Sequence, residues 1–219
     1  MKKIINWMQK NKWKILPVAI ILPLIFAISF KQVLDKTEKK RNRKIEFLVV
    51  HWTANTNPGA TAEMNAYYLR NKRQAGTHYC IDDEEIIQCT KEENVAYAVG
   101  DRKWLGFIPK PWLKNKIYNN NSLNFEMCLG GGRNDSLIFE QTAQILGWQM
   151  VNKGLDISRV VRHHDVTGKH CPRFNYQDDS WDQKKEDVAF FKFKLKVLEY
   201  AKYHLEKKKQ GKNIQAKVQ

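Results

Sequence analysis

Strand-like and helical segments follow one another in a mixed order along the chain, and this order constrains the fold more than any other feature. Apolar, β-rich runs lie at 47–50, 122–128 and 159–162, and residues 77–89 form a hairpin pattern. Helical patterns interrupt these runs without the steady strand–helix alternation of a purely parallel sheet. The sequence therefore predicts an α/β (mixed) fold, a central mixed β-sheet flanked by helices, that begins near Ile45.

Two of the helical segments have clear terminal signals. Thr61 is a suitable N-cap for a helix over about 62–73. A longer helix is capped by Asp135 or Ser136 and ends before Gly154, a residue type that commonly terminates helices.

A third helix begins with a capping-box pattern formed by Ser180 and Gln183. Apolar residues recur in it at helical spacing, so one face is predicted to pack against the sheet. That predicted face consists of Val188, Phe191, Leu195, Leu198 and Leu205. The helix is expected to end in the lysine run at 207–209, which leaves 207–219 as a basic flexible tail.

The net charge of +15 lies outside the central part of the chain. Residues 1–45 hold twelve Lys or Arg against two acidic residues, and residues 202–219 hold six against one. Residues 46–201 contain 20 basic and 20 acidic residues. Because nucleic-acid-binding domains carry their basic patch on the folded body, we expect no nucleic-acid partner. Basic ends suit an anionic surface such as phospholipid or wall polymer, or are simply solvated.

Residues 15–30 form an uncharged stretch of sixteen positions that five lysines precede. This pattern is typical of membrane targeting, so residues 1–30 are interpreted as a membrane anchor or signal segment. The stretch is slightly shorter than the ~17–20 residues that a spanning helix needs, and Ala27-Ile28-Ser29 offers a cleavage site after Ser29. Anchoring, cleavage and burial in the domain core all stay open. The charged residues 31–44 are predicted to be a basic linker.

The four cysteines include no C-x-x-C pair, which excludes a zinc ribbon and a thioredoxin-like motif. Cys80 and Cys89 could face each other across the hairpin, but free, partly buried thiols are the simpler expectation. Cys128 shares strand parity with Glu126 and is expected near the same face of the sheet.

Three candidate metal ligands lie at strand ends or on the loop that follows. His51 ends the first strand, His163 ends the last, and Cys171 follows eight residues later. Two imidazoles and one thiolate suit zinc, and three protein ligands leave a position for water, as catalytic zinc sites require. Taken singly, a histidine or cysteine is more often a buried or surface residue, so spacing alone is weak evidence.

Three further histidines are not assigned to the metal. His164 is expected to point to the opposite face from His163 if strand alternation persists. His170 is predicted to be exposed, and His78 in the hairpin is predicted to pack or to support a ligand.

Four motifs occur in an order that resembles the zinc-dependent N-acetylmuramoyl-L-alanine amidases. They are VVHWTANTNPGATAEMNAYYLR, AGTHYCID, NNNSLNFEM and VVRHHDVTGKHCPR, and they cover about residues 45–175. This family shares its fold, a mixed sheet flanked by helices, with bacteriophage lysozyme-type amidases and peptidoglycan recognition proteins. The resemblance implies a zinc amidase domain over 45–206 that cleaves the amide between N-acetylmuramic acid and L-alanine in peptidoglycan.

Carried over residue by residue, the resemblance implies that His51, His163 and Cys171 bind Zn2+. It implies Glu126 as general base and then general acid, and Lys169 as the cation that stabilises the developing oxyanion. Peptidoglycan or muropeptides are the expected partners. The domain is expected in the cell envelope, either membrane-anchored outside the cytoplasmic membrane or secreted after signal cleavage.

Two departures from the family pattern affect these expectations. Many relatives carry A-W-H where this chain has Ala96-Tyr97-Ala98, so contacts to the substrate are expected to differ. Thr77 stands where some relatives have a tyrosine near the metal, so the acid role rests on Glu126.

Two alternatives to an active envelope amidase stay open at the sequence level. A non-catalytic peptidoglycan-binding module would belong to a different functional class, although such modules generally lack the zinc cysteine that Cys171 supplies. A phage lysin would keep the same chemistry behind a weak membrane segment.

Overall fold

The computed structural model describes residues 29–34, 39–71, 75–100, 110–113 and 115–217. A six-stranded sheet in the order β1-β4-β3-β5-β2-β6 lies at its centre. The β3–β4 pair is the predicted antiparallel hairpin, and the other four pairs are parallel. The strands are β1 (Ser29–Gln32), β2 (Phe47–Trp52), β3 (Tyr79–Ile81), β4 (Glu85–Gln88), β5 (Ser122–Met127) and β6 (Val160–Arg162). The predicted mixed sheet with flanking helices is confirmed.

Capping residues explain where the helices begin and end. The helices are α2 (Ala62–Arg70), α3 (Asp135–Lys153), α4 (His163–Thr167) and α5 (Gln183–Lys217), with single 3-10 turns η1 (Pro111–Leu113) and η2 (Ile157–Arg159). The Thr61 side chain accepts a hydrogen bond from the backbone N–H of Met64, as predicted. Asn134, rather than Asp135 or Ser136, caps α3, and Gly154 ends it with a φ of 67°.

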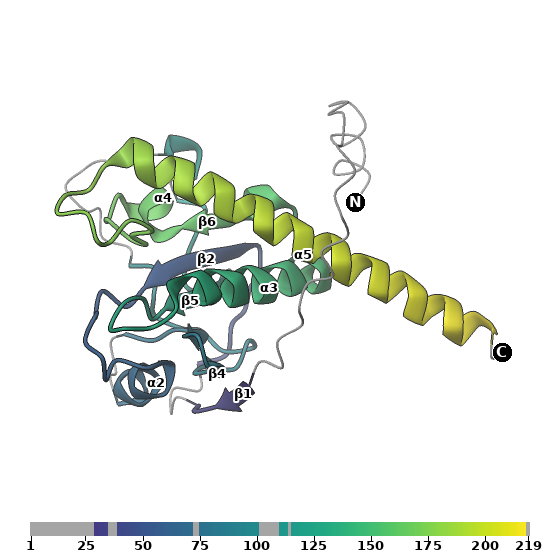
Figure 1. Ribbon diagram of the computed structural model, residues 1–219. Coiled ribbons are helices and arrows are strands. Elements are labelled where there is room, and N and C mark those ends of the chain that lie inside the picture. Colours follow the sequence, from purple (N-terminus) through teal and green to yellow (C-terminus); the bar gives the residue numbers. More distant parts are fainter. Residues whose placement is uncertain (1–28, 35–38, 72–74, 101–109, 114, 218–219) are drawn as a thin grey trace.

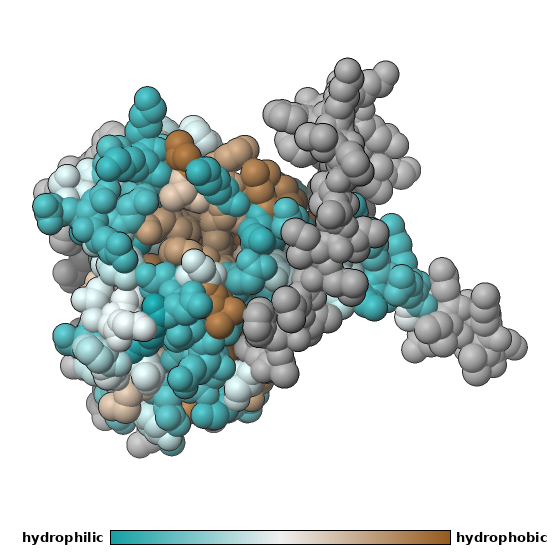
Figure 2. Space-filling view, viewed as in Figure 1, coloured by the Kyte–Doolittle hydropathy of each residue, from teal (hydrophilic) through white to brown (hydrophobic). Residues whose placement is uncertain are grey.

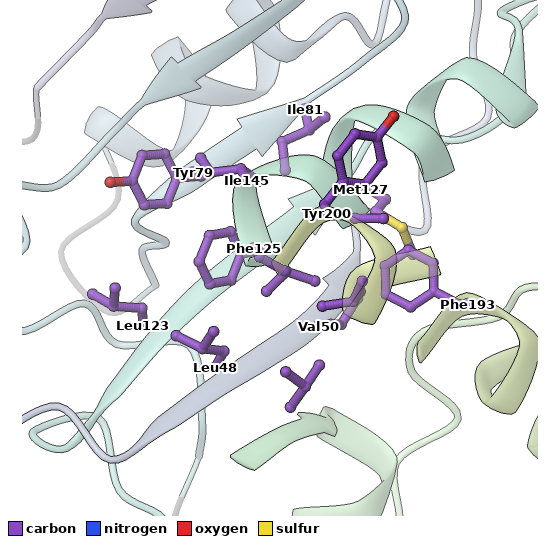
Figure 3. Packing of buried hydrophobic residues seen from close by; sticks show 14 of the residues in the cluster. Leu48, Val50, Tyr79, Ile81, Leu123, Phe125, Met127, Ile145, Phe193 and Tyr200 are labelled. Atoms are coloured by element: carbon purple, nitrogen blue, oxygen red, sulfur yellow. The ribbon is translucent and has the colours of Figure 1, made fainter. Parts of the chain in front are cut away.

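The main hydrophobic core lies between one face of the sheet and the helix pair α3 and α5 (Figure 1). Figure 3 shows Val50, Phe125 and Met127 of the sheet packed with Phe193 and Tyr200 of α5. Each fully buried side chain of this size contributes about 1.5–3 kcal/mol. Gly147 of α3 lets the two helices approach closely, because a Cβ there would lie 2.7 Å from the Ala201 backbone nitrogen.

The opposite face of the sheet carries two smaller apolar clusters with a polar strip between them. One cluster joins Cys80 and Cys128 to α2, and the other joins Val49 to the segment before β5. The strip holds alternate residues of β2 and β5, which therefore point away from the main core. The site described below lies on this strip.

Helix α5 packs through a different face from the one predicted. Val188, Phe191 and Leu195 are exposed, whereas Phe190 and Phe193 are buried. The helix has two apolar stripes, and the aromatic one fills the core against α3. The predicted capping box is also wrong, because the Asp182 side chain accepts the Lys185 N–H.

The predicted linker at 31–44 is structured where the structure describes it. Residues Ser29–Gln32 form edge strand β1, which pairs with β4 from Ser29 to Gln32. Arg41 donates hydrogen bonds to the carbonyl oxygens of Glu92, Asn94 and Asn120. A half-buried, multiply bonded guanidinium holds its segment against the domain, so the linker interpretation is corrected for these residues.

The C-terminal end also differs from the expectation. Helix α5 continues to Lys217, so most of the predicted tail at 207–219 is helical. Lysine and glutamine are good helix formers, which accounts for the extension. Residues 15–28 of the predicted membrane stretch lie outside the described residues, and among those described no helix has the length and apolarity to cross a bilayer.

Candidate metal centre

Three side chains from distant parts of the chain meet at one edge of the sheet. His51 is near the end of β2, His163 is the first residue of α4 directly after β6, and Cys171 lies on the next loop. Strands β2 and β6 are parallel, so their carboxyl ends deliver both histidines to the same edge. All three side chains are buried, and their ligand atoms lie within 4.8 Å of one another.

The spacing of these atoms suits a tetrahedral ion. The Nδ1 atoms of His51 and His163 are 3.1 Å apart, and Cys171 Sγ is 3.9 Å from His51 Nδ1. Zinc–nitrogen and zinc–sulfur bonds of ~2.0–2.1 and ~2.3 Å give tetrahedral ligand separations of roughly 3.4 and 3.6 Å. The donor set and its geometry therefore fit a zinc ion that keeps a fourth position for water.

Protonation of the two histidines also favours metal binding. Burial is the main cause that lowers the pKa of His51 to about 4 and that of His163 to about 2. Both rings are thus neutral near pH 7 and have a lone pair to offer. Burial raises the pKa of the Cys171 thiol, a cost that a divalent cation offsets by binding the thiolate.

Glu126 stands beside the three candidate ligands. It is the register partner of His51 on β5, and its Oε1 lies 3.9 Å from His51 Nδ1. Among the described residues its Oε2 has no hydrogen-bond partner, although that atom is buried. Burial raises the pKa of Glu126 to about 7, and the charge of Lys169 opposes that rise. The carboxylate thus lies beside the candidate ligands with one oxygen that no described residue bonds.

Lys169 is the exposed member of the group. Its positive charge lowers the pKa values of His51, His163 and Glu126, so it faces the same small volume. Its backbone carbonyl accepts a hydrogen bond from His164 Nδ1 at 3.0 Å, which fixes the loop that carries it.

A second layer of buried polar groups supports His51. Its Nε2–H donates to Asn124 Oδ1 at 3.1 Å, which leaves Nδ1 for the metal position. His78 Nδ1 accepts the Asn124 backbone N–H at 3.1 Å, and Arg41 reaches the other ring nitrogen of His78 at 2.9 Å. His78 is fully buried and supports a candidate ligand, in agreement with one of its two predicted roles.

The sequence pattern did not single out Asn124. A usable signal was present, because Asn124 precedes Glu126 by two residues and must share its face of β5. Arg41 carried no such signal, since it belongs to a charged stretch that reads as linker.

The other histidines take partly different places from those predicted. His163 begins a helical turn and does not end the strand, so the strand-alternation argument for His164 is wrong. His164 is nevertheless outside the ligand group. His170 is exposed as expected, and its ring stacks on Trp181 at 4.5 Å.

Thr77 and the three cysteines outside the ligand group, Cys80, Cys89 and Cys128, are structural. Cys80 and Cys89 form no disulfide, as the simpler expectation held, and both are buried rather than partly buried. Cys128 packs with Cys80 and Cys89 under α2 instead of joining the ligand group. The Thr77 hydroxyl donates to the Asn124 carbonyl at 2.9 Å and so braces β5.

Comparison with known proteins agrees with this geometry. Residues 41–174 match the family model described as N-acetylmuramoyl-L-alanine amidase. A probable N-acetylmuramoyl-L-alanine amidase of Bacillus licheniformis is 33% identical over 137 residues, which cover 58% of this chain and 36% of the relative. The amidase XlyB of Bacillus subtilis is 29% identical, over 65% of this chain and 42% of the relative. The chain thus spans about two fifths of the length of these curated relatives.

Solved structures share the fold. The catalytic domain of XlyA superposes with a TM-score of 0.60 at 22% identity, over 78% of this chain and 99% of that domain. The Staphylococcus aureus hydrolase AmiA, solved with its ligand, gives 0.61 at 16% identity, over 91% of this chain and 90% of AmiA. With a family model that matches more than half of its residues, this chain belongs to the N-acetylmuramoyl-L-alanine amidase family.

Proposed function

We propose that this chain is a zinc-dependent hydrolase that cleaves the amide bond between N-acetylmuramic acid and L-alanine in peptidoglycan. The observation that carries the proposal is the convergence of His51, His163 and Cys171 within 4.8 Å beside the half-buried carboxylate of Glu126. Membership of the N-acetylmuramoyl-L-alanine amidase family supports the choice of the bond that is cut.

Zinc is the ion that this donor set suits, because thiolate and imidazole ligands with one open position are typical of catalytic zinc. When bound, it lowers the pKa of a water molecule and polarises the carbonyl of the scissile amide.

Two residues of the chain take part in the reaction: Glu126 transfers a proton, and Lys169 stabilises negative charge. Glu126 accepts a proton from the attacking water through its unpartnered oxygen, and returns it to the leaving nitrogen of L-alanine. Water oxygen bonds to the lactyl carbonyl carbon, the C–N bond breaks, and the products are a lactyl carboxylate and a free amine. Lys169 supplies a fixed positive charge for the carbonyl oxygen as it becomes negative.

The test is mass spectrometry of muropeptides incubated with the purified full chain and zinc. The expected products are the intact sugar and a stem peptide with a free N-terminal L-alanine. Glu126→Gln should lose product formation, whereas Glu84→Gln, an exposed glutamate in the hairpin turn, should keep it. Tight binding of muropeptide with no product from the wild-type chain would instead support the non-catalytic binding module.

We further propose that the domain works outside the cytoplasm, where peptidoglycan lies, behind the membrane-targeting segment predicted at 15–30, whose last two residues belong to β1. The uncharged run after five lysines supports this placement. Cell fractionation and the N-terminal mass of the chain distinguish an anchor from cleavage after Ser29. A chain with an intact N-terminus in the cytosolic fraction would contradict both.

A further inference from the structure

The outward face of α5 is an apolar feature that no described part of the domain covers. Val188, Phe191 and Leu195 are 48%, 63% and 44% exposed. With Lys184 and Lys192 they line a shallow groove of about 690 Å³. Figure 2 shows hydrophobic side chains gathered along this part of the surface, over the helix that Figure 1 labels α5. Such a stripe normally meets a partner.

This stripe is not left over from packing of the domain. On the other side of the same helix Phe190, Phe193 and Val197 already fill the core against the sheet and α3. A helix that is apolar on two sides is one that packs on two sides.

The order of residues along the stripe identifies the partner. Val188 and Leu195 lie equally far from the midpoint between 191 and 192, and so do Lys184 and Glu199. In an antiparallel pair of α5 helices centred there, Val188 meets Leu195 of the partner subunit, and Lys184 comes level with Glu199 of the partner subunit. In a parallel pair like charges would meet. A two-fold axis requires this self-complementary pattern.

We propose that two copies of this chain associate through α5, antiparallel, with the two-fold axis beside Phe191 and Lys192. Lys184 and Glu199 are both exposed, and the Glu199 side chain is 72% exposed with a long 3.8 Å contact to Lys196. Both are therefore available for an intermolecular pair. The metal centre lies on the other face of the sheet, so both active sites stay open in the dimer.

Charge favours a second copy over an anionic lipid surface. Glu199 lies beside the apolar stripe and is exposed, whereas Asp187 is already paired with Arg162 at 2.5 Å. An anionic lipid surface offers no cation to Glu199, whereas an antiparallel copy supplies Lys184.

Disulfide crosslinking of the full chain tests the proposal. Lys192→Cys lies almost on the axis, so two copies would bring the new thiols within the ~4.4–6.8 Å Cα separation that a disulfide needs. Lys202→Cys is the matched control, because it is exposed on the same helix face but would lie roughly 30 Å from its copy. The four native thiols are buried and should not react.

On a gel run without reductant, we expect a band at twice 25.8 kDa for Lys192→Cys and at least tenfold less of this band for Lys202→Cys. In the Lys192→Cys background, Phe191→Glu should abolish the band, while Lys184→Glu or Glu199→Lys alone should reduce it several-fold. The double reversal Lys184→Glu with Glu199→Lys should restore it. Equal crosslinking at 192 and 202, or no rescue by the double reversal, would overturn the antiparallel dimer. Phe191-dependent binding to anionic vesicles without a crosslink would assign the stripe to lipid instead.

Discussion

Replacing Asn124 with leucine should weaken zinc binding through His51 without removing any metal ligand. Asn124 is fully buried and accepts the His51 Nε2–H at 3.1 Å, and its side-chain N–H groups point to His78 and Ser122. Leucine has a similar volume and no acceptor, so the His51 N–H would stay buried and unbonded. We expect the Asn124→Leu variant to lose about 1–3 kcal/mol of stability without metal and about 10–100-fold in zinc affinity.

Two assays separate these effects. Competition with a chromophoric chelator gives the zinc dissociation constant, and urea unfolding gives stability with and without the metal. At zinc 100-fold above the wild-type constant, the metal should stabilise the wild type by ~2.7 kcal/mol, but a 100-fold weaker variant by only ~0.4 kcal/mol. Gln149→Leu removes a buried amide of α3 far from the metal and should cost stability alone. A zinc affinity of Asn124→Leu within twofold of wild type would refute the reasoning.

Three further predictions follow from the same structure. Glu126→Gln should reduce amide hydrolysis by ~10²–10⁴-fold while zinc still binds, as measured by turnover and by metal content; a rate near wild type would remove Glu126 from proton transfer. Burial acts to raise the pKa of Glu92, but hydrogen bonds from Lys153, Tyr79 and Gln149 outweigh it and leave that pKa below its ordinary 4.5. Because the folded pKa is depressed, this stabilisation is present above pH 4.5 and is lost as pH falls below it. Glu92→Gln should therefore cost about 1–3 kcal/mol at pH 7 and less at pH 3.5 in urea unfolding; a difference that grows on acidification would contradict this. Gly147→Ala should destabilise by ~1–3 kcal/mol through overpacking against Tyr200 and Ala201, whereas Gly211→Ala, with open space around it, should be neutral or slightly stabilising; thermal unfolding of both variants decides.

The sheet was predictable because its strands are short apolar runs bounded by turn residues. β2, β5 and the β3–β4 hairpin lie where composition places them. β1 was not predictable, since Ser29 and Phe30 end an uncharged stretch typical of membrane targeting and Lys31 begins the predicted linker. Only pairing with β4 gives this segment its structure.

Helix α5 shows the limit of periodicity. Both stripes, one through Val188 and Phe191 and one through Phe190 and Phe193, have helical spacing. Spacing alone cannot decide which stripe faces the sheet, because that depends on the shape of the surface that α3 presents. The wrong choice is informative, since it leaves an apolar stripe on the outside.

The sequence predicted the candidate metal ligands, but it did not predict the whole layer of buried polar residues that supports them. Motifs around His51 and His163 identified the candidate ligands, and the structure brings them together with Cys171. The supporting layer of Asn124, His78 and Arg41 joins residues 83 positions apart, and no local spacing reveals it.

The most direct test of the account is X-ray absorption spectroscopy of the zinc-loaded full chain. We expect one zinc per chain, with two nitrogen ligands at ~2.0–2.1 Å and one sulfur ligand at ~2.3 Å. Cys171→Ser should remove the sulfur shell, and Cys128→Ser should leave it unchanged. A chain that binds no zinc, or a zinc shell without sulfur in the wild type, would contradict the convergence of β2, α4 and the following loop on one ion.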